Sequence, residues 1–98
     1  MKGGLKMKLL CFGATWCASC LVMEPRINEV AEQMPELEVI YYDYDLDIDA
    51  VRKWKVRDVL PTYVLIDKEG KELMRIVGEK SKEYLIKIIE ECKNKVEA

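Results

Sequence analysis

The stretch FGATWCASC, residues 12–20, joins an apolar run to a segment with helical periodicity. On a helix, the Cα atoms of Cys17 and Cys20 would lie roughly 5 Å apart, within the span of a disulfide. Cys17 stands where the helix would begin, and unpaired N–H groups there favour a thiolate. Cys20 falls on the apolar side, so we expect its sulfur to be the more shielded one. The pair has the arrangement of a nucleophile and a resolving thiol.

Two other roles for this Cys-x-x-Cys pair are disfavoured. A structural zinc site usually needs four ligands, but the chain has no histidine, and neither Cys11 nor Cys92 belongs to a second close pair. Inert packing is the other alternative, because cysteine is commonly buried. A pair at a strand-to-helix junction, directly after Trp16, instead favours redox chemistry.

Apolar and β-branched runs predict four strands, at residues 7–14, 37–45, 62–66 and 72–78. Helical periodicity predicts three helices, at residues 17–34, 47–56 and from Ser81 onward. We expect Pro25 to kink the first helix and Gly70 to supply the positive φ of a tight hairpin.

The shorter segments carry more specific expectations. Asp47 or Asp49 is expected to cap the second helix, with Val51 and Trp54 facing inward. Ser81 is expected to cap the last helix, which would bury one apolar stripe: Tyr84, Leu85, Ile88, Ile89, Cys92 and Val96.

The resulting order is strand–helix–strand–helix–strand–strand–helix in one domain over residues 1–98. A helix joins the first two strands, so they should be parallel, whereas the last two form an antiparallel hairpin. The sequence therefore predicts an α/β fold, a four-stranded mixed sheet flanked by helices.

Composition excludes several classes of function. The 16 basic and 18 acidic residues are interspersed and give a net charge of -2, so no basic face for nucleic acid is expected. No apolar stretch reaches the ~20 residues of a membrane span, and residues 9–14 are shorter than the apolar region of a signal peptide. We expect a cytoplasmic protein with no membrane association, where close cysteines are catalytic or metal-binding.

Taken together, these motifs resemble the thioredoxin family. The resemblance is carried by residues 12–20, by Pro25, by LPT at residues 60–62, by EGKE at residues 69–72 and by VG at residues 77–78. It covers nearly the whole chain from about Lys6. Family members usually begin with an additional strand and helix, so the chain looks like a trimmed form with a CASC active site.

The resemblance assigns roles to individual residues. It makes Cys17 the attacking sulfur, Cys20 the resolving sulfur, and Pro61 the family's cis-proline facing the pair. On propensity alone Pro61 would be an ordinary trans turn proline, because only about 5–6% of X–Pro bonds in folded proteins are cis. The same likeness places the following residues around a groove for an extended substrate peptide: Trp16, Ala18, Ser19, Leu60, Thr62, Val77 and Gly78.

The sequence departs from the family at two places. Ala18 and Ser19 replace the Gly-Pro of typical thioredoxins, so the redox potential of those proteins cannot be assigned to this cysteine pair by analogy. Cys11 stands where the family has a buried Asp that helps move the proton of the resolving thiol. Cys11 is either a passive core thiol or a third thiol that bonds Cys20 or binds a soft metal ion. Asp43 is our candidate proton acceptor in its place; the alternative is a solvated carboxylate.

The resemblance implies a monomeric thiol–disulfide oxidoreductase that reduces protein disulfides, holds no cofactor, and is itself reduced by a flavoprotein of the thioredoxin-reductase type. Two alternatives stay open. One is a glutaredoxin-like activity with glutathione, disfavoured by Trp16 and by the Ala-Ser dipeptide. The other is a non-enzymatic module that holds a partner or bridges an iron–sulfur cluster.

Overall fold

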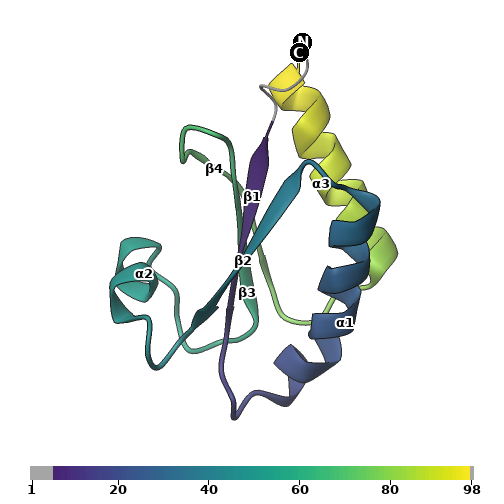
Figure 1. Cartoon of the computed structure of the whole chain (residues 1–98). Helices are drawn as coiled ribbons and strands as arrows, with labels where there is room; N and C mark the ends of the chain where they lie inside the picture. The colour runs from purple at the N-terminus through teal and green to yellow at the C-terminus, as the bar shows by residue number, and fades with distance from the viewer. Residues whose placement is uncertain (1–5, 98) are drawn as a thin grey trace.

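The computed structural model describes residues 6–97. Residues 1–5 and residue 98 lie outside this range. Seven elements follow one another (Figure 1): β1 (Met7–Gly13), α1 (Ala18–Gln33), β2 (Leu37–Asp43), α2 (Ile48–Lys53), β3 (Thr62–Ile66), β4 (Glu72–Val77) and α3 (Lys82–Glu97). Their order is the predicted one.

The four strands form one mixed sheet in the order β2-β1-β3-β4. β1 pairs in parallel with β2, from Met7 opposite Leu37 to Gly13 opposite Asp43. β3 runs antiparallel to both β1 and β4, so the predicted hairpin is confirmed, and Gly70 in its turn has a φ of 87°. β1 is hydrogen-bonded on both sides, which fixes the position of its carboxyl end, where the cysteine motif follows.

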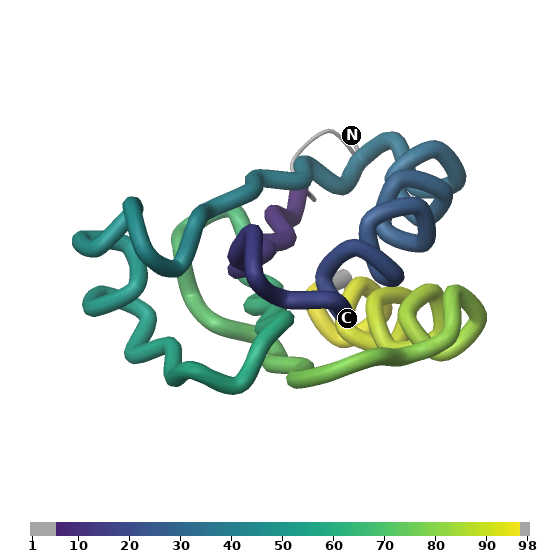
Figure 2. The backbone as a smooth tube through the Cα atoms, turned by 90° about the horizontal axis from the view of Figure 1, so that it is seen from below, coloured from purple at the N-terminus to yellow at the C-terminus, as the bar shows by residue number. Residues whose placement is uncertain are grey.

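Helices cover both faces of the sheet (Figure 2). α1 and α3 lie side by side on one face, over a core cluster that includes Cys11, Ile27 and Leu65. The short α2 lies on the other face, where Phe12 and Val64 belong to a second, smaller cluster. Alternate residues of β1 therefore enter different cores, as the period of two of a strand requires.

Most element boundaries lie within one or two residues of the predicted ones. The helix predicted at residues 47–56 is shorter and ends at Lys53, because Lys55 has a φ of 54° and the N–H of Val56 donates to the carbonyl of Val51. Val51 and Trp54 are half-buried against the smaller core cluster, as expected. α1 runs through Pro25 without interruption to Gln33.

The predicted caps differ in their outcome. Ser81 caps α3, since its hydroxyl accepts the N–H of Tyr84 at 3.0 Å. Asp47 occupies the N-cap position of α2, but its carboxylate makes no capping bond there. Asp47 Oδ2 instead accepts the N–H of Asp43 at 2.6 Å, which ties the end of β2 to the start of α2.

The apolar stripe of α3 is narrower than predicted. Leu85 and Ile89 are fully buried, whereas Tyr84 and Val96 are 41% and 37% exposed. Tyr84 lies a quarter turn or more away from the line through Leu85 and Ile89. Val96 is in the last helical turn, where fewer neighbours cover it. The prediction that these two residues belong to the core is wrong.

Burial on α3 can be tested with a matched pair of variants. We expect Ile89→Ala to lower the free energy of unfolding by about 2–5 kcal/mol, because it leaves a cavity between α3 and the sheet. Val96→Ala on the same helix should change it by less than ~0.5 kcal/mol. Urea unfolding of the oxidised protein measures both, and equal losses would contradict the placement of Ile89 in the core.

Candidate active site

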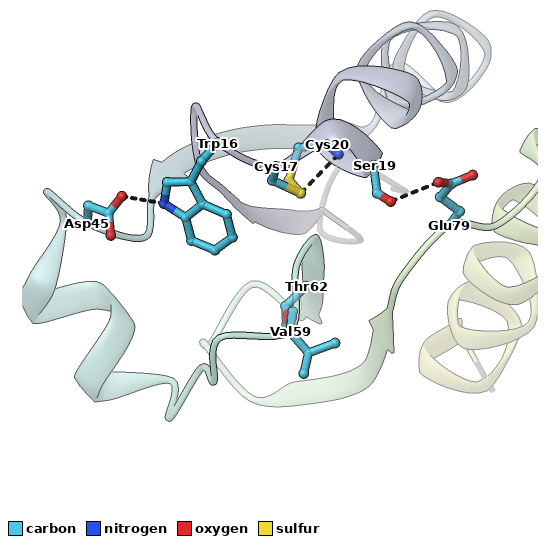
Figure 3. Close-up of a disulfide and its surroundings, with 8 residues drawn as sticks. All are labelled: Trp16, Cys17, Ser19, Cys20, Asp45, Val59, Thr62 and Glu79. Atoms are coloured by element: carbon cyan, nitrogen blue, oxygen red, sulfur yellow. Dashed lines mark hydrogen bonds between the residues drawn. A yellow bond between two sulfur atoms is a disulfide. The ribbon is translucent and has the colours of Figure 1, made fainter.

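The two cysteines of the CASC motif form a disulfide at the start of α1 (Figure 3). Their Cα atoms are 5.3 Å apart, close to the separation predicted from the sequence. Cys17 is the N-cap residue of α1, and its Sγ accepts the backbone N–H of Cys20 at 3.2 Å. An N–H in this position also stabilises negative charge on Cys17 Sγ when the disulfide opens.

The two cysteines differ in their exposure as whole residues. Cys17 is 7% exposed, whereas Cys20 is half-buried. Cys20 lies in the first turn of α1, before the buried residues Met23 and Ile27 of the same helix. A cavity of about 420 Å³ borders Cys20. As a whole residue, Cys20 is therefore less buried than Cys17; the expectation that its sulfur is the more shielded one stays a prediction.

Pro61 lies close to the pair. The Leu60–Pro61 peptide bond is cis, as the resemblance implied, and Pro61 lines the same cavity as Cys20. The carbonyl of Pro61 accepts the N–H of Gly78 at 2.8 Å. Gly78 has a φ of 90°, which explains a glycine at that position.

Several residues predicted to bind substrate surround the disulfide. Trp16 is 58% exposed, and its Nε1 donates to Asp45 Oδ2 at 2.8 Å, so its ring is held beside Cys17 (Figure 3). Val77 is 41% exposed. Val59, which sequence reasoning missed, is 56% exposed and also borders this region (Figure 3).

Other predicted groove residues serve the structure as well. Thr62 is 3% exposed, and its hydroxyl donates to the carbonyl of Val59 at 2.8 Å. Leu60 is half-buried and packs against the smaller core cluster. Ala18 is exposed. Ser19 Oγ donates to Glu79 Oε2 at 2.8 Å, a partner 60 residues away that no sequence signal identified.

Cys11 is buried in the larger core cluster, and its thiol lies 3.7 Å from the carbonyl oxygen of Leu9. Burial raises the pKa of the Cys11 thiol far above its ordinary value. It is therefore protonated at neutral pH, which favours the passive role over that of a third nucleophile. Within residues 6–97, no group of three or more Cys, Asp or Glu side chains could hold a metal ion.

Asp43 is half-buried at the end of β2. Its Oδ1 accepts the backbone N–H groups of Asp45 at 2.8 Å and Leu46 at 3.1 Å, the pattern of an Asx turn. This turn ends β2 two residues before the predicted boundary. Asp43 lines the same cavity as Cys20, and its carboxylate also has a structural role in the turn.

Known proteins are similar to this chain in both sequence and fold. The family model described as Thioredoxin matches residues 4–91. The chain belongs to the thioredoxin family. Thioredoxin H7 of Arabidopsis thaliana is 37% identical over 88 residues, which are 90% of this chain and 67% of that protein. Thioredoxin H2-2 of Oryza sativa subsp. japonica is 37% identical over 83 residues, 85% of this chain and 60% of that protein.

Solved thioredoxin structures show the same architecture. A mutant thioredoxin from Halobacterium salinarum superposes with a TM-score of 0.81 at 31% identity, over 90% of this chain and 75% of that one. A thioredoxin from Nicotiana alata gives a TM-score of 0.79 at 36% identity, over 88% and 72%. With the disulfide in the family's redox position, this domain is a thiol–disulfide oxidoreductase. None of the helices in residues 6–97 is long and apolar enough to cross a membrane.

The buried Cys11 thiol predicts a pH dependence of stability. In the unfolded chain Cys11 ionises from its ordinary pKa of about 8.5 upward, whereas the native thiol keeps its proton. The unfolded state then binds fewer protons than the native state, so Cys11 lowers stability as the pH rises. Between pH 9 and pH 11 we expect the wild type to lose ~2–3 kcal/mol more than Cys11→Ala.

Urea unfolding of both proteins at a series of pH values measures this difference. Because the tyrosines titrate in both proteins, subtraction isolates Cys11. Parallel pH profiles would mean that Cys11 ionises in the folded protein and remains a candidate nucleophile.

Proposed function

We propose that this protein reduces disulfide bonds of protein substrates. The thiolate of Cys17 attacks a substrate sulfur, the substrate disulfide breaks, and a mixed disulfide forms on Cys17. Cys20 then attacks Cys17 Sγ, releases the reduced substrate and closes the Cys17–Cys20 disulfide. The observation that carries the proposal is that disulfide at the N-terminus of α1, with Cys17 Sγ already accepting a helix N–H.

The surroundings of Cys17 suit an extended peptide. Trp16 and Val59 offer exposed apolar surface around the disulfide (Figure 3), and Val77, which pairs with Thr62 on β3, is also exposed. The Pro61 carbonyl accepts a hydrogen bond from the N–H of Gly78, which holds the backbone at Pro61 beside the backbone at Gly78. We infer that a substrate strand lies along the backbone beside Pro61, where main-chain hydrogen bonds would accept many sequences.

Regeneration requires two electrons from outside the chain. A flavoprotein disulfide reductase of the thioredoxin-reductase type is the proposed donor. The compartment proposed is the cytoplasm, because thiols are kept reduced there and a close cysteine pair acts catalytically. The cluster-bridging alternative is not favoured, because the family model and the relatives that match this chain are thioredoxins.

Single cysteine variants test the proposal with insulin as the disulfide substrate, NADPH as the electron source and a thioredoxin reductase. Cys17→Ser should lose turnover completely, because no attacking sulfur remains. Cys20→Ser should accumulate a mixed disulfide with substrate on Cys17, visible by mass spectrometry. Cys92→Ser, which removes a half-buried thiol from α3, is the matched control and should keep wild-type turnover. Activity retained in Cys17→Ser would disprove the proposal.

A second experiment tests Asp43 as the proton acceptor for Cys20. Asp43→Asn keeps the oxygen that accepts the N–H groups of Asp45 and Leu46 but removes the charge. We expect resolution of the mixed disulfide to slow by about 10- to 100-fold at neutral pH. The deficit should shrink as the pH rises, since Cys20 then ionises without help.

Stopped-flow kinetics of a single turnover across pH measures this step. Asp49→Asn, in the first turn of α2, is the control and should leave the rate unchanged. A deficit in Asp43→Asn that is the same at every pH would assign Asp43 to the turn alone.

A further inference from the structure

The cavity of about 420 Å³ borders only one of the two active-site cysteines. Its wall contains Cys20 but not Cys17. It lies on the face of the sheet that α1 covers, since Cys11 and Tyr63 of the larger core cluster also line it. This volume falls within the range of roughly 300–1,000 Å³ typical of pockets that hold small molecules.

Gly13 leaves the Cys20 sulfur open on this side. Gly13 is two residues beyond Cys11 on β1, so both face the same side of the sheet. A Cβ built on Gly13 would lie 3.1 Å from Cys20 Sγ. Because glycine has no side chain, residue 13 contributes only backbone atoms to the cavity wall beside Cys20.

The two ends of the disulfide also differ as leaving groups. A thiol attacking Cys20 expels the thiolate of Cys17, which accepts the Cys20 N–H at the helix N-terminus. A thiol attacking Cys17 expels the thiolate of Cys20, which lies one turn inside α1. Exchange is faster when the leaving thiolate is the more stable one, so the open end of the disulfide is also the chemically favoured one.

We propose that small uncharged or cationic thiols enter this cavity and open the disulfide by attack on Cys20. The small thiolate bonds to Cys20 Sγ, the bond between the two cysteines breaks, and its electron pair leaves on Cys17 Sγ. A second small thiolate then attacks the sulfur of the first, releases a symmetric small disulfide, and leaves Cys20 as a thiolate that takes up a proton. This reaction needs only the disulfide and is independent of protein-disulfide reduction.

The charges on the cavity wall select among small thiols. Glu24, Asp43 and Asp47 line the cavity, and its wall includes no lysine or arginine among the described residues. Tyr41 on the same wall is uncharged at neutral pH, because burial raises its pKa to about 12. The wall therefore opposes additional negative charge, and an anionic thiol is disfavoured relative to a cationic one of the same size.

Three thiols of similar size test the proposal: cysteamine, 2-mercaptoethanol and 2-mercaptoethanesulfonate. For each thiol, we measure the rate constant for reduction of the oxidised protein, normalised to the concentration of thiolate. This rate constant is divided by the one for the oxidised peptide of residues 14–20, which has no cavity. We expect the preference for the cationic over the anionic thiol to exceed that of the peptide by about 10-fold at low salt. High salt should reduce it.

The position of the adduct is the direct readout. After acid quenching and alkylation with maleimide, fragmentation of the tryptic peptide of residues 9–26 locates the small thiol. An adduct on Cys20 is expected. An adduct on Cys17, or a charge preference no greater than that of the peptide, would overturn the proposal.

Variants of two glutamates on α1 distinguish the effect of charge on the cavity wall from the effect of the overall charge of the protein. Glu24→Gln should lower the preference about two- to threefold. Glu32→Gln, also exposed on the same helix but outside the cavity wall, should leave it unchanged. Equal effects of the two variants would attribute the preference to net charge and contradict the role of the cavity.

Discussion

The hydrogen bond from the Cys20 N–H to Cys17 Sγ, 3.2 Å long, makes two chemically similar sulfurs unequal. It exists because Cys17 is the residue before the first turn of α1, where N–H groups lack partners within the helix. The position of that turn depends in turn on β1. The strand is bonded on both sides within the sheet, and the N–H of Cys17 donates to the carbonyl of Ala14 at 3.1 Å. The redox couple thus follows directly on one of the two central strands of the sheet.

Much of this arrangement follows from local sequence. Residue spacing predicts the element order, and Ser81 caps its helix as its position before the last apolar stripe indicates. The N-cap position of Cys17 was also predictable, because it depends only on where β1 ends and α1 begins. The groove required more than spacing: the cis state of Pro61 came from the family resemblance and not from propensity.

Tertiary contacts decided what the sequence could not. Periodicity placed Cys20 on the inner side of α1, but exposure depends on what lies opposite the helix, and opposite Cys20 is Gly13 beside a cavity. The same reason explains why Asp47 does not cap α2: its carboxylate accepts the N–H of Asp43 instead of an N–H of its own helix. The contact between Ser19 and Glu79 joins residues 60 apart in the chain, and no local pattern encodes such a pair.

The substitution at position 11 links these observations. A carboxylate at that position could exchange a proton with the resolving thiol, but a buried thiol whose pKa is raised keeps its proton and cannot act as a base at neutral pH. A proton from Cys20 must therefore leave by another route. The cavity beside Cys20 provides one, because it reaches Asp43 and is large enough to admit water. The opening that allows the proton to leave also borders the resolving cysteine, so in this chain the exit of the proton and the proposed access of small thiols to Cys20 depend on one local structure.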